Sequence, residues 1–411
     1  MSKRIRTSTW KNALTLMGVG LFATVALAGG TTLIKASKRK PLIVLPAPSP
    51  TPSPTPTPTP APTPTPTLTS AGSLDFSAVQ LPAIASNFDV NSLLVPSWGT
   101  GELAKSGYPD TVGAFRFICG AGQLASDDPI VRPGQPGASH LHQFFGNTGA
   151  NAYSTYASLR TSGDSTCNNM LNRSAYWMPA MLNGKGGVVR PDYVVVYYKR
   201  FPKNSAYCTT KGKACVDLPR GLRFVFGYNM IDPSKTPTGA SFFDCQGSAA
   251  TPGRYATITE ARAGCPVGTQ LGAKISAPEC WNGIDLDSPD HRSHVAYQMI
   301  DPNDGQAKCP ATHPYIIPTF SLGVWYTTDA DMGTWRLSSD DMPGMPSMPS
   351  GSTFHADWFG AWDDNVMATW GANCIEKLLS CAGGDLGNGW QLRMDHGYSY
   401  VANPRVVPVP T

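Results

Sequence analysis

The chain has 411 residues and a formal net charge of +4, from 32 basic and 28 acidic residues. Residues 1–45 hold eight of the basic residues and no acidic one, so the remainder carries 24 basic and 28 acidic residues, a net charge of −4. A nucleic-acid partner needs a basic face to pair with phosphates, so we expect no nucleic acid to bind.

The first 34 residues have the organisation of an export signal. Four basic residues precede an uncharged run at residues 12–34, and residues 26–28 match an A-x-A cleavage site. The uncharged run has 23 residues, which is long enough to span a bilayer if it is not cut. We expect either a cleaved signal peptide or an uncleaved transmembrane anchor. In both cases the rest of the chain is extracellular, secreted or anchored to the cell surface.

Residues 35–72 predict an extended linker. A basic cluster opens it, and every even position from Pro46 to Pro66 is proline, separated by Ala, Ser or Thr. Proline fixes φ and removes the backbone donor, so the segment should form a polyproline-type spacer of about 3 Å per residue, roughly 70 Å long. Such a spacer would hold a domain away from a membrane or carry it through a cell wall.

Residues 73–411 predict a single globular domain that is mainly β. Alternating or β-branched runs predict strands at residues 114–119, 193–198, 222–228, 294–300 and 322–326. Helical periodicity is scarce, and the clearest predicted helix spans residues 374–381. Many short strands with long Gly- and Pro-rich loops favour a β-sandwich or jelly-roll-like domain.

All ten cysteines fall in this domain, so an exported chain is expected to form up to five disulfides. Cys208 and Cys215, and likewise Cys374 and Cys381, are close enough in sequence to close small loops. The other six cysteines allow 15 pairings, among which the sequence does not choose. A cysteine-based zinc site is not favoured, because the chain has no C-x-x-C pair.

Histidine clusters are the clearest chemical feature of the chain. Four of the seven histidines lie in the pairs His140/His142 and His291/His294. In a strand, His140 and His142 would share one face and could form half of a metal site, a general base with its neighbour, or a structural pair. Histidine titrates near neutral pH and is the commonest metal ligand.

Residues 279–297 form the densest polar segment. Asp285 and Asp287 would share a face if extended, and Asp290 and the second histidine pair follow. Paired carboxylates suit acid–base catalysis on a sugar or ester, whereas an oxygen-rich cluster could bind calcium. The structural alternative is a polar turn, since Asp-Ser-Pro-Asp is favourable turn chemistry.

Residues 354–363 place His355 and Asp357 at alternate positions among aromatic residues. This combination is typical of sugar-binding clefts, and equally of an aromatic core around a buried histidine.

Shortly before this segment, Met342, Met345 and Met348 each precede a proline. Thioethers are soft ligands that suit Cu(I), but we interpret this repeat as an exposed loop.

Several signatures are missing. The sequence contains no G-x-S-x-G, H-E-x-x-H, P-loop or Rossmann motif, which disfavours α/β-hydrolases, common zinc proteases and nucleotide enzymes.

The motifs HLHQFFGN, CWNG, DSPDHRSH, FHADWF and DHGY, within residues 112–405, resemble the secreted family known as domain of unknown function nineteen ninety-six. The resemblance implies an extracellular, carbohydrate-associated role, and it supplies no catalytic assignment.

Our leading hypothesis is an extracellular hydrolase or lyase that acts on polysaccharide or cell-wall glycan. Its predicted catalytic residues are His142, His291, His294, Asp287 and Asp290, and we expect His294→Ala to abolish turnover with little loss of stability.

Two alternatives stay open. One is a non-catalytic glycan-binding module, and the residues predicted to contact a glycan in either case are Trp281, Asn282, Trp358, Trp362 and Tyr398. The other is a secreted metal-binding protein that uses His140, His142, His355 and Asp357 to bind a divalent metal, namely zinc, calcium or copper.

Overall fold

The computed structural model describes residues 67–68, 74–98, 103–107, 111–396 and 398–410. The predicted signal or anchor and nearly all of the predicted linker lie outside the described residues. The described part is a β-sandwich, as predicted, and its two main sheets enclose one large hydrophobic core.

The first sheet has six strands in the order β13-β14-β20-β10-β4-β23. Neighbouring strands within it are antiparallel, except that β23 runs parallel to β4. The predicted strands at 114–119, 193–198 and 322–326 are confirmed within it. The strands are β13 (Ser241–Gln246), β14 (Gln270–Ser276), β20 (Thr319–Thr327), β10 (Tyr193–Arg200), β4 (Gly113–Cys119) and β23 (Ser380–Cys381).

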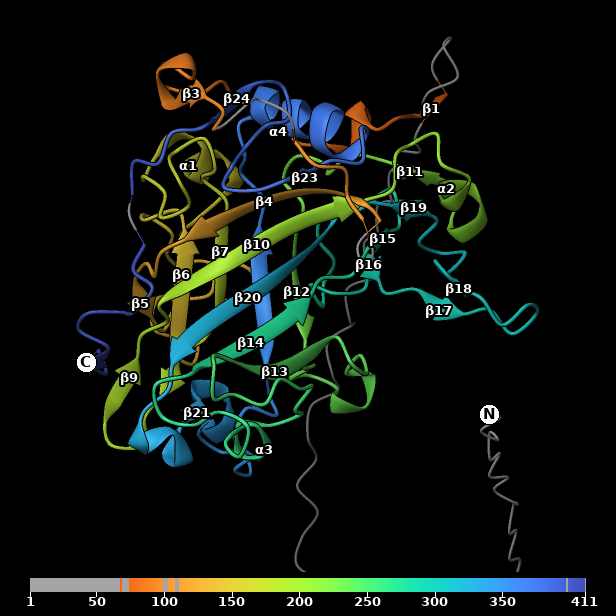
Figure 1. Ribbon diagram of the computed structural model, residues 1–411. Helices are drawn as coiled ribbons and strands as arrows, with labels where there is room; N and C mark the ends of the chain where they lie inside the picture. Colours follow the sequence, from red (N-terminus) through yellow and green to blue (C-terminus); the bar gives the residue numbers. More distant parts are fainter. Residues whose placement is uncertain (1–66, 69–73, 99–102, 108–110, 397, 411) are drawn as a thin grey trace, which may run out of the picture. The chain divides into compact units, whose positions relative to one another are not determined.

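The second sheet has five antiparallel strands in the order β12-β22-β7-β6-β5. The predicted strand at 222–228 is confirmed as β12. The strands are β12 (Arg223–Gly227), β22 (His355–Phe359), β7 (Ala175–Pro179), β6 (His142–Gly146) and β5 (Leu124–Ala125). In Figure 1 the long strands of the first sheet run obliquely across the front of the nearly upright β6, β7 and β12.

Aromatic side chains hold the two sheets together. Phe320 of β20 contacts Trp358 of β22 and Phe226 of β12, with ring centroids 5.0 and 5.3 Å apart. The hydroxyls of Tyr176 on β7 and Tyr198 on β10 lie 2.7 Å apart across the same interface. Because side chains alternate along a strand, the residues between these aromatics on β7, β12 and β22 point to the outer face of the second sheet.

Shorter elements complete the domain. The short strands are β1 (Thr67–Leu68), β2 (Leu74–Asp75), β3 (Leu94–Pro96), β8 (Met181–Leu182), β9 (Gly187–Val189), β11 (Ala214–Cys215), β15 (Cys280–Trp281), β16 (Val295–Ala296), β17 (Met299–Ile300), β18 (Ala307–Lys308), β19 (Tyr315–Ile316), β21 (Arg336–Leu337), β24 (Trp390–Leu392) and β25 (Val406–Pro408). The helices are α1 (Tyr156–Thr161), α2 (Ala206–Lys211), α3 (Ile258–Ala261) and α4 (Asp364–Trp370), with a further helical segment at Gly371–Ile375 and short 3-10 turns η1 (Ser77–Val79), η2 (Asn91–Leu93), η3 (Pro233–Lys235), η4 (Ala330–Thr334) and η5 (Ser338–Asp341).

Two predicted elements differ from the structure. The strand predicted at 294–300 is only β16 and β17, two short strands that pair with different partners. The helix predicted at 374–381 lies earlier in the chain, because Asp363 caps α4 at its start through the amides of Asn365 and Val366. Residues 380–381 instead extend the first sheet as β23.

All ten cysteines form disulfides, which confirms the predicted number and the two short loops. The pairs are Cys119–Cys167, Cys208–Cys215, Cys245–Cys265, Cys280–Cys309 and Cys374–Cys381. Five disulfides fit an oxidising compartment. Among the described residues, no helix combines the length and apolar character that a membrane crossing needs.

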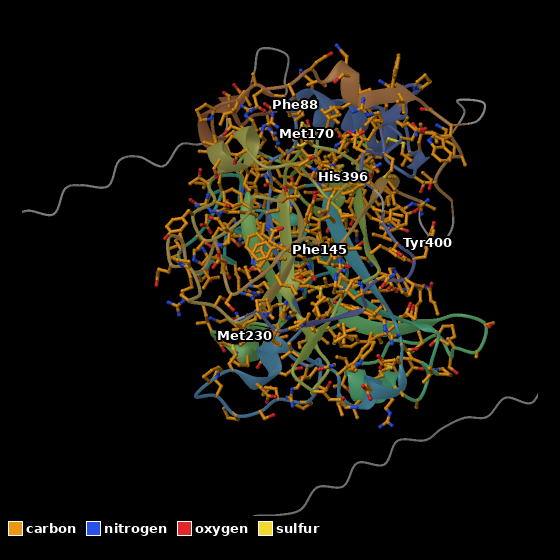
Figure 2. All side chains as sticks on the ribbon, turned by 90° about the vertical axis from the view of Figure 1, so that its left-hand side faces the viewer. Phe88, Phe145, Met170, Met230, His396 and Tyr400 are labelled. Atoms are coloured by element: carbon orange, nitrogen blue, oxygen red, sulfur yellow. A yellow bond between two sulfur atoms is a disulfide. The ribbon has the colours of Figure 1, made fainter. Side chains whose placement is uncertain are left out.

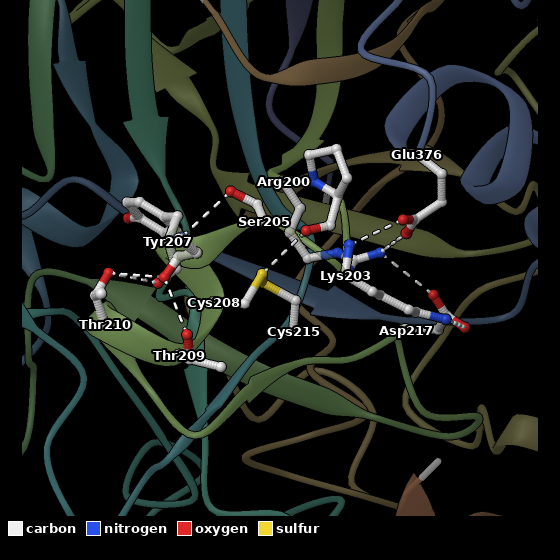
Figure 3. Close-up of a disulfide and its surroundings, with 12 residues drawn as sticks. Arg200, Lys203, Ser205, Tyr207, Cys208, Thr209, Thr210, Cys215, Asp217 and Glu376 are labelled. Atoms are coloured by element: carbon white, nitrogen blue, oxygen red, sulfur yellow. Dashed lines mark hydrogen bonds and ion pairs between the residues drawn. A yellow bond between two sulfur atoms is a disulfide. The ribbon is translucent and has the colours of Figure 1, made fainter. Parts of the chain in front are cut away.

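The Cys208–Cys215 loop lies beside a buried cation. Figure 3 shows Arg200, at the end of β10, paired with Glu376 at 2.6 Å and with Asp217 at 3.5 Å. Lys203 pairs with Asp217 from the solvent side at 2.6 Å. Two carboxylates on one buried guanidinium offset part of its lost hydration, and Asp217 ties the segment after Cys215 to the end of β10.

Replacing Phe320 tests whether the sandwich interface holds the fold together. Phe320→Ala should lower the free energy of unfolding by about 3–5 kcal/mol, because a buried ring is removed from between the sheets. Denaturant unfolding with the disulfides intact measures this, and Tyr153→Ala, on a 65% exposed side chain, should change it by no more than about 0.5 kcal/mol. Equal effects for the two variants would contradict the interface described above.

Candidate metal centre

The outer face of the second sheet carries polar side chains that are buried. On β22, Ala356 and Trp358 face the core, and His355 and Asp357 therefore face outward. On β6, Phe145 faces the core and His142 faces outward. All three outward residues are buried, with exposed fractions of 3% for His355, 1% for Asp357 and 0% for His142. Loops must therefore cover this part of the outer face.

Three imidazoles converge on that face. One nitrogen from each of His140, His142 and His355 lies within 4.8 Å of the other two. The ring centroids of His140 and His142 are 4.2 Å apart, and those of His140 and His355 are 5.1 Å apart. The strand register explains the meeting, since β6 and β22 both pair with β7, and His140 lies two residues before the start of β6.

Backbone carbonyls orient two of the rings. The Nδ1–H of His142 donates to the carbonyl of Asp127 at 2.9 Å, and that of His355 donates to the carbonyl of Thr353 at 2.8 Å. Each bond places the free electron pair of the neutral ring on Nε2. The Nε2 atoms of His140 and His142 are buried and have no hydrogen-bond partner. This arrangement, an outer nitrogen bonded and an inner one free, is typical of metal-ligating histidine.

A buried aspartate fixes the segment that orients His355. The Asp340 carboxylate accepts hydrogen bonds from the amides of Leu337 and Gly351, at 2.8 and 2.7 Å, and from the Thr353 hydroxyl at 2.7 Å. Thr353 in turn supplies the carbonyl that holds His355. The loop before β22 is thereby closed at its base by one fully buried carboxylate.

Electrostatics keep the imidazoles neutral. Burial, together with the neighbouring His355, lowers the pKa of His142 to about 3. Burial and the adjacent rings also lower the pKa values of His140 and His355 well below the usual range. A neutral imidazole is the form that binds a metal ion. Three such rings without a cation between them would leave buried lone pairs without partners.

Two carboxyl groups and a guanidinium lie beside the rings. Both oxygens of Asp357 are buried without a hydrogen-bond partner, and burial together with the carboxyl of Asp128 raises the pKa of Asp357. Burial likewise raises the pKa of Asp128. Arg292 donates to the carbonyls of Gly227 and Tyr228, at 3.2 and 2.8 Å, and its charge opposes the rise in the pKa of Asp357.

A cavity of about 260 Å³ gives access to this group. Its lining includes His140, His355, Asp128, Asp357 and Arg292. Two larger cavities, of about 560 and 610 Å³, have no histidine in their lining. The cavity beside the imidazoles is therefore a stronger candidate for chemistry than these two, although it is smaller.

The second histidine cluster lies in a different pocket. His291 donates from Nδ1 to Asp287 at 2.9 Å, and the other oxygen of Asp287 accepts from Arg223, also at 2.9 Å. Asp287 and His291 line a separate cavity of about 500 Å³ together with Phe359. Of the residues predicted to be catalytic, Asp290 lines the cavity beside the three imidazoles, whereas Asp287 and His291 line this separate one.

His294 and Asp290 have structural partners. The ring of His294 is buried, with Nε2 donating to the carbonyl of Arg223 at 2.9 Å and Nδ1 2.8 Å from the Ser288 hydroxyl. Asp290 accepts from the amide and hydroxyl of Ser293, both at 2.8 Å, and so closes the predicted polar turn. Because the buried ring of His294 is bonded through both nitrogens, this geometry favours a structural role, and its predicted catalytic role stays a prediction.

The predicted glycan-contacting residues do not form an open row. Trp281, Trp358 and Trp362 are at most 3% exposed and belong to the core. Asn282 is used within a turn, bonding the side chain of Asp285 at 2.8 Å, and Tyr398 bonds Tyr400 at 3.0 Å. Three core indoles cannot stack on a sugar ring in this structure.

The remaining histidines lie elsewhere. His313 donates from Nε2 to the carbonyl of Ser293 at 2.8 Å, and its Nδ1 lies 2.9 Å from the Thr312 hydroxyl. His396 pairs with Asp164 at 3.0 Å, at a place well away from Met230, which lines the cavity (Figure 2). The adjacent Asp395 pairs with Arg393, so the sequence neighbours Asp395 and His396 do not act as a dyad.

Sequence reasoning missed several members of the site. Asp128 precedes the histidine pair by twelve residues, in a loop that the sequence marks only by its Pro and Gly content. Arg292 stands between the histidines of the second cluster but turns into the cavity of the first. Thr353 orients His355 through its carbonyl, which any residue type could supply, so no sequence signal identifies this role.

Comparison with known proteins identifies a family. The model of the family described as Domain of unknown function (DUF1996) matches residues 128–362, more than half of the chain. The chain belongs to this family. The match to the DUF1996 model begins at Asp128 and ends just beyond β22, so it spans the three converging histidines, Asp357 and Arg292. No curated protein and no solved structure matches the chain.

A substitution at His294 separates the structural from the catalytic interpretation. His294→Ala should lower the free energy of unfolding by about 2–4 kcal/mol, because a buried ring and two hydrogen bonds are lost. Thermal or denaturant unfolding measures the loss. His396→Ala, on a partly exposed ion pair, is the matched control and should cost no more than about 1 kcal/mol. An unchanged stability in His294→Ala would restore the catalytic interpretation.

Proposed function

We propose that this chain is an exported metalloenzyme that binds one transition-metal ion through His140, His142 and His355. The observation that carries the proposal is the convergence of three buried neutral imidazoles, two of which have their outer nitrogens bonded to carbonyls. The donor set selects among the metals considered above. Imidazole suits zinc and copper, whereas calcium takes six to eight oxygen ligands.

The open side of the centre favours catalysis over a purely structural metal. Three protein ligands and an adjoining cavity are the pattern of catalytic sites, whereas structural zinc sites are usually closed by four ligands. An ion bound there supplies a Lewis acid that can polarise a substrate oxygen or activate water. The protein contributes the enclosure, the charged groups and the orientation.

Asp357 is the residue best placed to move a proton. It lines the cavity two positions after His355, on the same face of β22, and both of its oxygens lack other partners. Arg292, held by the carbonyls of Gly227 and Tyr228, faces the same space and can orient an oxygen-rich substrate. A carboxyl and a guanidinium beside a metal suit hydrolysis or elimination.

We propose polysaccharide or cell-wall glycan as the substrate class. The proline-rich linker would hold the domain at or beyond a wall, where glycan is abundant. The binding-module alternative is less favoured, because Trp281, Trp358 and Trp362 are buried. The tryptophans of the described residues that are exposed are Trp98, at 80%, and Trp390, at 47%, and both lie on the β3–β24 pair or just beyond it.

Removal of one imidazole tests the metal centre. The protein loaded with Zn(II) or Cu(II) and freed of excess metal should retain about one ion per chain, and His142→Ala should retain almost none. Elemental analysis of the purified protein measures this. His313→Ala, outside the cluster, is the control and should retain the ion. Equal retention by both variants would end the proposal.

Asp357→Asn tests the enzymatic part. Turnover of polysaccharide by the metal-loaded protein, followed as released reducing ends or as unsaturated ends, should fall by about 100-fold or more, because a proton-transfer group is lost. Metal content should stay near that of the unaltered protein. Asp331→Asn, on a partly exposed ion pair, should leave turnover unchanged. Full turnover in Asp357→Asn would contradict the assigned role.

A further inference from the structure

The methionine–proline repeat, interpreted above as an exposed loop, lies at the metal centre. It occupies the connection between η5 and β22, and its base is held by Asp340, whose carbonyl accepts from the amide of Met348 at 2.8 Å. The amide of Met345 bonds the carbonyl of Met342 at 3.0 Å, which makes a tight turn at Gly344. The repeat is therefore a shaped turn with a fixed base.

Two of its thioethers line the same cavity as the histidines. Met342 and Met345 share that lining with His140 and His355. Met230, from the segment after β12, contributes a third methionine to the lining. Met345 is 45% exposed, which places it at the cavity mouth. The third repeat residue, Met348, does not line the cavity.

This combination of donors has a specific chemical meaning. Neutral imidazole binds both zinc and copper, but thioether sulfur is a soft ligand that favours Cu(I) over Zn(II). A turn that served only to exclude water from the cavity could equally well carry leucine at these positions. The ten cysteines are all in disulfides, so no thiolate of this chain competes for the metal.

We propose that the three-histidine centre takes copper, and that the thioethers of Met230, Met342 and Met345 bind the ion as Cu(I) at the cavity mouth. The inference rests on the proposed metal site and names its metal. The methionine turn then acts as a soft ligand set at the cavity mouth, where Cu(I) enters before it reaches the imidazoles, and the open side of the three-histidine centre stays free. A Zn(II) ion at the same imidazoles gains nothing from it.

The double variant Met342→Leu/Met345→Leu tests this, since leucine keeps the apolar volume and removes the sulfur. Under anaerobic conditions, competition with bicinchoninate should give a Cu(I) affinity at least about tenfold weaker than that of the unaltered protein. The Zn(II) affinity of the double variant should agree with that of the unaltered protein within about twofold, because Zn(II) is a borderline ion and binds thioethers weakly. Met348→Leu, from the same repeat but outside the cavity, should match the unaltered protein for both ions.

The outcomes separate the two proposals. Cu(I) affinity unchanged in the double variant, with Zn(II) and Cu(I) both bound by the unaltered protein, overturns the copper assignment and leaves the metal centre in place. Absence of binding of either ion by the unaltered protein overturns both. A loss confined to Cu(I), absent in Met348→Leu, supports the assignment and excludes a general effect of repacking the loop.

Discussion

The structure depends on how three imidazoles and a carboxyl group are accommodated on the outer face of a sheet. His142, His355 and Asp357 project from β6 and β22 on the side away from the main core, yet the covering loops bury them. Burying polar groups without partners is costly, and protein groups satisfy only the outer nitrogens of His142 and His355. The metal ion proposed at the inner nitrogens would resolve this cost, since it would take the free electron pairs that no donor of the chain reaches.

The surrounding structure serves to hold these groups in place. The aromatic contacts around Phe320 fix the second sheet against the first, and with it the register that aligns β6, β7 and β22. Asp340 closes the loop that carries both the orienting carbonyl of Thr353 and the methionine turn. The disulfides Cys119–Cys167, Cys245–Cys265 and Cys280–Cys309 join residues 20 to 48 positions apart and tie down loops with little regular structure. Rigid positioning of donors by packed strands and bonded loops is what a metal site of defined geometry requires.

The sequence predicted much of the fold, because strand patterning is local. Alternation identified β4, β10, β12 and β20 closely, and cysteine spacing identified the two short disulfide loops. The sequence also predicted a helix over residues 374–381, because the apolar spacing there is helical. In the structure, the cap at Asp363 sets the start of the helix earlier. Partners joined by long loops, such as Cys119 and Cys167, depend on tertiary structure.

The site was predictable in part for the same reason. The alternate spacing of His140 and His142, and of His355 and Asp357, indicated shared faces, and these four are close together in the structure. His291 and His294 have the same local appearance, but the turn closed by Asp290 directs them to other partners. Asp128, Arg292 and the methionines reach the site through loops, whose course no periodicity encodes.

The most direct test of the metal centre is an anomalous-diffraction measurement on crystals of the metal-loaded protein, collected on both sides of the absorption edge. The proposed centre should give a single strong peak about 2.0–2.1 Å from one nitrogen each of His140, His142 and His355. A peak at His291 and Asp287 instead, or no ordered metal at the three imidazoles, would contradict it.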